Sequence, residues 1–475
     1  MSQTKKTKIV ATLGPASSDK DTLRNMVLAG VNVFRINFSH ADYSDVTERI
    51  KIIRELNDEL GTNTAILADL QGPKLRVGVM EEALLKDGDT FTFTTEKCIG
   101  NNKKAFMTYQ TFPQDVKKGE NILVDDGKLM FEVIDSDGDK NVTTKVVRGG
   151  ELKSKKGVNL PNTNISQPAL TEKDIEDAIF AIGQEVDWIA LSFVRTGEDL
   201  KMLHDLIAKH SEHRIPVIAK IEKPEAVKNI DSLIPFCDAI MVARGDLGVE
   251  IPMNEVPLVQ KNLVLRAKQA RIPVIIATQM MESMIENLVP TRAEVNDVAN
   301  SIIDGADAVM LSGETSVGID PANVIQYMSN IVESVENSPI IKVPADAPHI
   351  KTKRYISKAI CHHAALMAND IDAAAIATLT NSGYTAFQVS AWRPRNTHIL
   401  AFTSNKRILT MLNLLWGVKA FYYSNLVNTD TTIREINQIA KEQGLLQKDD
   451  YVINLTSMPV KEKGMVNTMR LTQVK

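Results

Sequence analysis

The chain has 475 residues, a formal net charge of −4 and 44% hydrophobic residues. At about 150 residues per domain, this length allows about three domains, and the hydrophobic content argues against a largely disordered chain. Because 55 basic residues face 59 acidic ones, the composition disfavours a nucleic-acid binder that depends on a bulk positive field, although a local basic pocket remains compatible with it.

The cysteines and the apolar runs indicate the compartment. Cys98, Cys237 and Cys361 lie far apart and form no CxxC pair, so we expect neither a disulfide framework nor a zinc cluster, and a reducing environment. The basic start of the chain leads into no continuous apolar segment, and no stretch approaches about 18 uninterrupted apolar residues. We therefore expect a soluble, cytoplasmic protein with no membrane partner.

A repeating βα pattern occupies most of the chain. Helical patterns with apolar residues three and four apart separate runs that are near-continuously apolar, as buried parallel strands are. These runs cover 7–14, 31–39, 64–72, 186–194, 216–222, 238–246, 273–280 and 306–314. Eight such units predict an α/β fold, a closed (β/α)8 TIM barrel over 1–72 and 165–340, interrupted after its third strand.

The two remaining segments lack the repeating βα pattern of the barrel. Residues 73–164 contain short β-favouring runs separated by Asp-Gly and Gly-Gly turns, which predicts an inserted all-β domain. Three prolines between 338 and 348 indicate a linker. A helical pattern at 354–369, followed by five strand-like runs, then predicts a C-terminal α/β domain over 345–475.

In such a barrel, the active site lies at the carboxyl ends of the strands. Any single strand may end in a polar residue because it must exit to solvent, but several strands that all end in charged or hydroxyl groups favour a shared site. These candidates are Thr12, Arg35, Asn37, Ser39, His40, Asp69, Lys220, Glu222, Arg244, Gly245, Asp246, Thr278, Gln279, Ser312 and Glu314.

The residue types point to the chemistry of phosphoryl transfer. Glu222 and Asp246 are suited to a hard divalent cation, Lys220 and Arg35 supply fixed positive charge, and Gly245 lets backbone N–H groups approach an anion. Phosphoryl transfer depends on positioning and charge neutralisation more than on covalent catalysis. No Ser-His-Asp set, nucleophilic cysteine or His-rich metal site competes.

Three other groups of residues have simpler interpretations. The His362–His363 pair lies in a helical pattern outside the barrel, and we expect a surface pair rather than a metal site. Met280, Met281 and Met284 are expected to pack around the seventh strand. The lysines at 153–156 are either a solvated charge run or phosphate contacts, and the sequence leaves both readings open.

The strand-end motifs closely resemble the pyruvate kinase family, in its bacterial type. They occur in the family's order, as TLGPAS (12–17), FRINFSH (34–40), GPKLRVG (72–78), KKGVNLP (155–161), PALTEKD (168–174), FVR (193–195), KIE (220–222), MVARGDLGVEIP (241–252), ATQMMESM (277–284), PTRAEVNDVAN (290–300) and DAVMLSGET (307–315). The resemblance implies transfer of the phosphoryl group of phosphoenolpyruvate to ADP. The products are pyruvate and ATP, formed in the last step of glycolysis through a metal-stabilised enolate. It also implies a homotetramer.

The same resemblance implies a role for each matching residue. Glu222 and Asp246 would bind Mg²⁺ or Mn²⁺, and Lys220 would neutralise the transferring phosphoryl group and the enolate. The implied substrate contacts are Lys220, Ala243, Arg244, Gly245, Asp246, Thr278 and Ser312. The implied nucleotide contacts are Arg35, Asn37, His40, Arg76 and Lys156, and the implied catalytic set is Lys220, Thr278, Arg35 and Arg76. Thr278 with water, backed by Ser312 and Glu314, is a candidate route for protonating the enolate, and the donor itself stays open.

One position bears on monovalent cations. Family members that need K⁺ carry Glu where this chain has Lys74, and Leu70, Gln71, Lys74 and Val77 together resemble the K⁺-independent branch. A lysine ammonium can supply the charge that a bound K⁺ would otherwise bring. The alternative is that K⁺ still binds, through Asn37, Ser39 and Asp69 beside Leu70. We expect that K⁺ is not required.

The third domain carries a candidate effector loop. Thr380, Asn381, Ser382, Gly383 and Thr385 precede and begin a helix, and they resemble the family's loop for the phosphate of an activator. An ordinary helix cap has the same appearance. The segment 458–464 lacks the tryptophan pattern of the animal forms activated by fructose 1,6-bisphosphate, so a sugar phosphate and AMP both stay open as the effector.

Two competing functions are compatible with part of this pattern. A divalent-metal aldolase acting on a 2-oxo acid would share the carboxylate pair, but it would have no use for Arg76 and Lys156 in an insertion. A catalytically inactive, metabolite-binding homologue should have lost a catalytic group, yet all four are present: Lys220, Glu222, Asp246 and Thr278.

Overall fold

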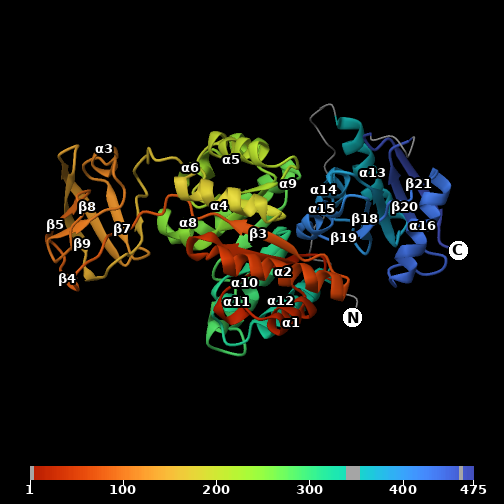
Figure 1. Cartoon of the computed structure of the whole chain (residues 1–475), viewed down its shortest axis with the longest axis horizontal. Coiled ribbons are helices and arrows are strands. Elements are labelled where there is room, and N and C mark those ends of the chain that lie inside the picture. Colours follow the sequence, from red (N-terminus) through yellow and green to blue (C-terminus); the bar gives the residue numbers. More distant parts are fainter. Residues whose placement is uncertain (1–4, 339–353, 459–463) are drawn as a thin grey trace.

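The structure is a computed structural model that describes residues 5–338, 354–458 and 464–475. Residues 339–348 of the predicted linker, and residues 459–463 of the loop after the last parallel strand, lie outside the described residues. Figure 1 shows three parts in a row, with the barrel between the inserted domain and the third domain. The proposed boundaries of these domains stay predictions.

The central part is a closed barrel of eight parallel strands, which confirms the predicted fold class. The ring runs in chain order, and β16 closes on β1 through the pairs Lys8–Ala308 to Ala11–Leu311. The strands are β1 (Lys8–Thr12), β2 (Val33–Asn37), β3 (Ala65–Asp69), β12 (Trp188–Leu191), β13 (Val217–Ile221), β14 (Ala239–Ala243), β15 (Val274–Ala277) and β16 (Ala308–Leu311).

Helices surround this ring, and short helices follow β14 and β16 at the carboxyl face, by which we mean the end of the barrel formed by the carboxyl ends of its strands. They are α1 (Lys20–Ala29), α2 (Tyr43–Leu60), α4 (Glu172–Gly183), α5 (Gly197–His210), α6 (Pro224–Lys228), α7 (Ile230–Leu233), α8 (Arg244–Glu250), α9 (Val256–Ala270), α10 (Arg292–Asp304), α11 (Gly313–Ser316) and α12 (Pro321–Glu336). Their starts are capped as the sequence dictates. On α4, for example, Thr171 and Asp174 cap each other reciprocally.

The inserted domain leaves the barrel after β3 and returns before α4. Its main sheet has the order β11-β7-β8-β9-β5-β6, and β10 pairs with β4. The core contains Phe91, Phe93, Phe112 and Phe131, whose rings pack edge-on or tilted. The elements are β4 (Ala83–Leu85), β5 (Thr90–Thr94), β6 (Lys104–Phe106), α3 (Phe112–Asp115), β7 (Asn121–Val124), β8 (Leu129–Ser136), β9 (Asn141–Arg148), β10 (Gly150–Leu152) and β11 (Val158–Asn159).

The third domain is a five-stranded sheet of order β19-β18-β17-β20-β21, in which β21 alone runs antiparallel to its neighbour. Its elements are α13 (Tyr355–Asp370), β17 (Ala375–Leu379), α14 (Tyr384–Ala391), β18 (His398–Thr403), α15 (Lys406–Met411), β19 (Val418–Tyr422), α16 (Thr429–Glu442), β20 (Tyr451–Thr456) and β21 (Thr468–Gln473).

The third domain covers the amino end of the barrel. The indole N–H of Trp188, the first residue of β12, donates to the carbonyl of Met411 at 3.0 Å. The Asn413 side chain donates to the carbonyl of Asn32, just before β2, at 3.0 Å. The opposite, carboxyl face is therefore left open toward the inserted domain (Figure 1).

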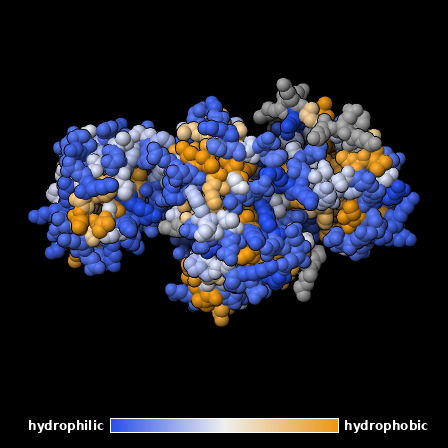
Figure 2. All heavy atoms as spheres, viewed as in Figure 1, coloured by the Kyte–Doolittle hydropathy of each residue, from blue (hydrophilic) through white to orange (hydrophobic). Residues whose placement is uncertain are grey.

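The surface is mainly hydrophilic on the face that Figure 2 shows, with hydrophobic residues in separate patches over each domain. In the described parts of the chain, no helix combines the length and the apolar character that a membrane span needs. All three cysteines are free, and burial raises the pKa of the Cys361 thiol to about 12.

The expectation for the histidine pair was half wrong. His363 is exposed, but His362 is buried, with 5% of its surface exposed, and its ring centre lies 4.1 Å from that of Trp392. Helix α13 packs against α14, and adjacent helical residues point about 100° apart, so His362 faces this contact while His363 faces solvent. By contrast, Met280, Met281 and Met284 belong to the barrel core, which confirms their predicted packing role.

Candidate active site

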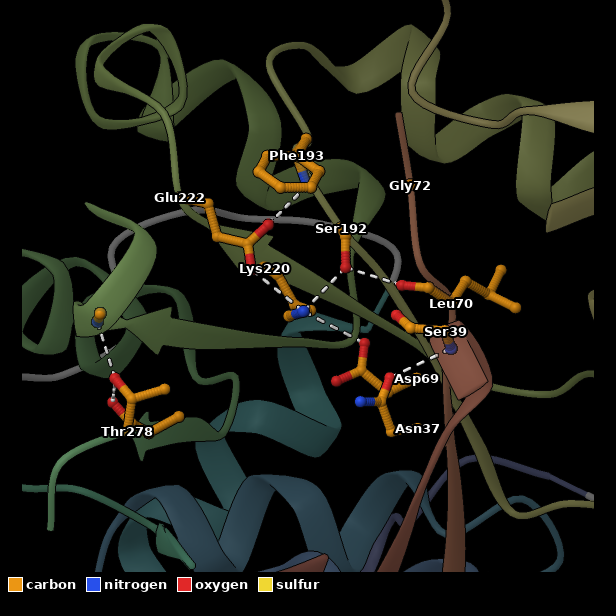
Figure 3. Close-up of polar contacts among 12 residues, drawn as sticks. Asn37, Ser39, Asp69, Leu70, Gly72, Ser192, Phe193, Lys220, Glu222 and Thr278 are labelled. Carbon is orange, nitrogen blue, oxygen red and sulfur yellow. Dashed lines mark hydrogen bonds and ion pairs between the residues drawn. The ribbon is translucent and has the colours of Figure 1, made fainter. Parts of the chain in front are cut away.

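Lys220 is the centre of the polar cluster at the carboxyl face. It is the fourth residue of β13, and its side chain is only 11% exposed. Its ammonium donates to the Ser192 hydroxyl at 2.7 Å, and lies 3.0 Å from the Glu222 carboxylate and 3.2 Å from that of Asp69 (Figure 3). Three neighbouring strands thus hold one cation at a fixed place.

Asp69 ends β3 and links Lys220 to Arg35. Its other carboxylate oxygen accepts a hydrogen bond from Arg35 Nε at 2.6 Å, and Arg35 Nη1 donates to the Thr12 hydroxyl at 3.0 Å. The predicted strand-end residues of the first three strands therefore lie together. Asp69 therefore pairs with both cations, while Lys220 is also paired with Glu222.

Burial and charge act against each other on these groups. Burial alone would lower the pKa of Lys220, but the Asp69 and Glu222 carboxylates raise it above its ordinary value. Burial opposes the charged form of Asp69 too, yet Lys220 and Arg35 lower the pKa of that carboxyl. For Glu222, burial and the charge of Asp246 raise the pKa despite the nearby Lys220.

The fourth strand, β12, also contributes residues from its carboxyl end, although none of them was among the candidates from the sequence. We call this expectation, that site residues lie at the carboxyl ends of the barrel strands, the strand-end rule. Ser192, next after β12, accepts the Lys220 hydrogen bond and donates to the Leu70 carbonyl at 2.7 Å. Phe193 has φ 55°, and its N–H donates to Glu222 at 2.7 Å. Gly72 makes room for this turn, because a Cβ there would lie 2.9 Å from the Ser192 and Phe193 side chains.

Glu222 and Asp246 fit a divalent cation by their chemistry. Asp246 lies half-buried in the first turn of α8, and its carboxylate has no hydrogen-bond partner among the described residues. Burial raises the pKa of Glu222, and the charge of Asp246 raises it further; a hard cation held by both carboxylates would offset that charge. The described residues hold no group of three or more His, Cys, Asp or Glu side chains arranged for a metal, so further ligands would come from substrate and water.

Thr278 has a strained backbone. It follows β15 with φ 70°, and Gln279 has φ 53°, a conformation that costs a β-branched residue about 1–3 kcal/mol. The Thr278 hydroxyl accepts the N–H of Gly245 at 2.7 Å and donates to the Ala277 carbonyl at 2.6 Å. The turn therefore places this hydroxyl against the start of α8.

The Arg244 side chain holds that turn in place. Its guanidinium donates to the carbonyls of Thr278 at 2.7 Å and Gln279 at 3.2 Å, and pairs with Asp297 of α10 at 2.7 Å. The sequence analysis named Arg244 only as a strand-end candidate and an implied substrate contact. Its side-chain role was missed because it depends on Asp297, which lies 53 residues away in the chain.

We expect Asp297→Ala to lower kcat about 10- to 100-fold, because a loosened Arg244 would let the Thr278 turn shift. Asp297→Asn keeps an oxygen acceptor for the guanidinium and should lose much less. Steady-state kinetics on both variants test this. An Asp297→Ala enzyme with wild-type kcat would show that Arg244 does not position the turn.

Ser312 and Glu314 lie at the end of the eighth strand but are not hydrogen-bonded to Thr278. The buried Glu314 carboxylate accepts the backbone N–H of Ser312 at 2.7 Å and that of Met281 at 3.1 Å. These bonds tie the end of β16 to the turn after β15. A proton route through Thr278, Ser312 and Glu314 is not assembled by hydrogen bonds among the described residues, and it stays a prediction.

The predicted monovalent-cation residues gather beside Asp69. The Asn37 side chain accepts the N–H of Ser39 at 3.2 Å, and both lie next to Asp69 and Leu70 in Figure 3. Lys74 is exposed, and it lines a cavity of about 30 Å³ at the seam between barrel and inserted domain, together with Asp246.

The predicted nucleotide residues of the inserted domain are not in the cluster. Arg76 Nη1 donates to the Lys155 carbonyl at 3.0 Å, and Lys156 pairs with Asp125 at 2.8 Å. Among the described residues, neither side chain has a hydrogen bond or ion pair with the barrel. His40 ends a short turn of helix after β2, and its side chain is not part of what the structure describes.

The candidate effector loop borders a cavity of about 320 Å³ in the third domain. Thr380, Asn381, Ser382 and Thr385 line it together with Arg354, whose guanidinium lies 4.3 Å from the centre of the Tyr384 ring. Gly383 has φ 80°, and its N–H donates to the Thr380 hydroxyl at 2.9 Å, which forms the turn before α14.

Comparison with models of known protein families identifies the family of this chain. Residues 4–325 match the family model "Pyruvate kinase, barrel domain", and residues 358–472 match "Pyruvate kinase, alpha/beta domain". The chain belongs to the pyruvate kinase family.

Individual pyruvate kinases agree along the whole length. The protein of Corynebacterium efficiens is 43% identical over 470 residues, covering 98% of this chain and 97% of the relative. The pyruvate kinase of Mycobacterium tuberculosis is 41% identical, with 99% of each chain covered. A solved pyruvate kinase from Cryptosporidium parvum has a TM-score of 0.93 at 32% identity, covering 99% of this chain and 96% of that one.

Proposed function

We propose that this protein is a phosphotransferase that moves the phosphoryl group of phosphoenolpyruvate to ADP, giving pyruvate and ATP. The observation that carries the proposal is the buried Lys220 ammonium, held between Asp69 and Glu222 where a family substrate would sit. A cation fixed in this way stabilises charge that develops during transfer without reorganising.

Each group of residues at the carboxyl face would have its own role in this reaction. Lys220 and Arg35 would neutralise the transferring phosphoryl group, and Lys220 would also stabilise the enolate oxygen that transfer leaves behind. The start of α8, at residues 244–246, would hold the substrate's carboxylate, beside Thr278. Glu222 and Asp246 would hold Mg²⁺ or Mn²⁺, which supplies Lewis-acid stabilisation of substrate oxygens.

The inserted domain would complete the site by closing. Arg76 and Lys156 contact only their own domain in this structure, and closure over the carboxyl face would bring them to the nucleotide with Arg35, Asn37 and His40. Closure would also exclude water, which strengthens each electrostatic contact.

A coupled assay for ATP formation tests the reaction. We expect ATP only when ADP, phosphoenolpyruvate and a divalent cation are all present. Release of a 2-oxo acid from an aldol substrate, with no ATP formed from phosphoenolpyruvate, would instead support the metal-aldolase alternative.

We further propose that activity does not require K⁺, because the ammonium of Lys74 supplies the positive charge. Replacing K⁺ by tetramethylammonium at matched ionic strength should leave kcat within about twofold, whereas Lys74→Glu should make the rate rise on addition of K⁺. Initial rates in the two salts provide the measurement. A drop of tenfold or more for the wild type would show that K⁺ is bound and needed.

The cavity beside Thr380–Thr385 is proposed to bind the phosphate of a sugar phosphate or a nucleoside monophosphate. Such a ligand should lower the phosphoenolpyruvate concentration at half-saturation, and Ser382→Asp should abolish the response by charge repulsion. Titration with several phosphosugars and AMP provides the test. If none of these compounds shifts the half-saturation point, the loop is an ordinary helix cap.

Family membership also supports a homotetramer and a cytoplasmic location as proposals for this chain. Exposed apolar side chains on the third domain, including Ile356, Met469 and Leu471, offer surface for contacts between copies.

A further inference from the structure

A buried ion pair outside the polar cluster connects the two segments that carry the carboxylate pair. Lys223 Nζ lies 2.6 Å from Glu250 Oε1, and the two side chains are 7% and 0% exposed. Lys223 directly follows Glu222. Glu250 ends helix α8, one helical turn after Asp246, and the helix fixes the distance between those two residues.

The inserted domain takes part in the same contact. The side-chain amide of Asn159, the last residue of β11, donates to the same Glu250 oxygen at 2.8 Å. Lys156 lies in the segment before Asn159, and Gly157 of the same segment forms an isolated antiparallel β-bridge with Arg76. One carboxylate oxygen therefore joins the loop after β13, helix α8 and the inserted domain.

Stability alone is a weak reason for this pair. Removing two charges from water costs several kcal/mol per ion, so a buried pair often contributes no more than apolar side chains of similar volume would. The other Glu250 oxygen is buried and has no hydrogen-bond partner, which adds to that cost. What the pair does provide is a side-chain link between the loop after β13 and helix α8, beyond the last backbone pair of the two strands at Ile221 and Val242.

We propose that Lys223 and Glu250 are positioning residues, which set the separation of the Glu222 and Asp246 carboxylates and tie the inserted domain to that geometry. This inference rests on the proposed function, in which those carboxylates hold a divalent cation. Partners behind metal ligands typically affect metal affinity about 10- to 100-fold.

The test is Mn²⁺ binding to the full-length protein without substrate, followed by electron paramagnetic resonance. Lys223→Met and Glu250→Gln should each weaken Mn²⁺ binding about tenfold or more. The double variant Lys223→Met/Glu250→Gln leaves neither charge buried without its partner. It should therefore be thermally more stable than either single variant, while its Mn²⁺ binding stays weak. Asn159→Ala should leave Mn²⁺ binding within about twofold and lower kcat, because it frees only the inserted domain.

A second buried ion pair provides the matched control. Lys268 contacts Asp307 at the amino end of the barrel, with both side chains buried. Lys268→Met should lower thermal stability but leave Mn²⁺ affinity unchanged. Single variants with wild-type Mn²⁺ affinity, or a double variant in which affinity returns together with stability, would overturn the positioning role.

A different result would contradict the proposed function itself. If Glu222→Gln binds Mn²⁺ as tightly as the wild type, the carboxylate pair is not the metal site. If Glu222→Gln loses Mn²⁺ while Glu250→Gln does not, the metal site stands and only the positioning role is wrong.

Discussion

Replacing Lys220 by methionine should lower kcat about 10³-fold, the upper range for removal of one preorganised electrostatic group. The methionine side chain fills similar space but cannot donate to Ser192 or neutralise a phosphoryl group in transfer. Because Asp69 keeps its ion pair with Arg35 at 2.6 Å, the barrel should still fold. Steady-state rates of ATP formation, with circular dichroism to check folding, provide the measurement.

Lys268→Met is the control for this variant as well. Both lysines are buried and paired with carboxylates, but Lys268 lies at the covered amino end of the barrel. Its loss should reduce stability and leave kcat near the wild-type value. Equal rates for Lys220→Met and wild type would refute the role given to the ammonium.

The second large effect is expected for Asp246→Asn. This change removes one of two carboxylates and should weaken Mg²⁺ or Mn²⁺ at least as much as loss of an outer partner does, about 10- to 100-fold. At limiting metal, kcat/KM should fall accordingly, and added metal should restore part of it. Rates measured across a metal titration distinguish this from a loss of folding.

Asp430→Asn is a suitable control, because Asp430 also lies in the first turn of a helix, but in the third domain. It should leave the metal dependence unchanged. An Asp246→Asn enzyme with the metal dependence of the wild type would exclude Asp246 as a ligand.

The fold was predictable because buried parallel strands leave long apolar runs, and eight of them can be counted. The strand-end rule then found Lys220, Glu222 and Asp69, whose side chains meet because β3, β12 and β13 are neighbours in the ring. The same rule would have found Ser192. It was missed because the fourth apolar run was taken to extend to residue 194, which placed Ser192 inside the strand, whereas β12 ends at Leu191.

Other parts of the site could not be derived from sequence patterns. The hydrogen bonds of Arg244 to the Thr278 turn depend on Asp297 of α10, 53 residues away in the chain. The backbone strain at Thr278 cannot be read from the amino-acid sequence. The burial of His362 depends on how α13 packs against α14. The position of Arg76 and Lys156, away from the cluster, depends on how the inserted domain lies relative to the barrel.

The most direct test of the central claim follows labelled phosphate. Phosphoenolpyruvate carrying ³²P is incubated with ADP, Mg²⁺ and either wild-type protein or Lys220→Met, and the label in ATP is counted over time. The arrangement around Lys220 predicts rapid transfer of label to ATP by the wild type, and a rate about 10³-fold lower for the variant. No label in ATP with the wild type, or equal transfer by both proteins, would contradict it.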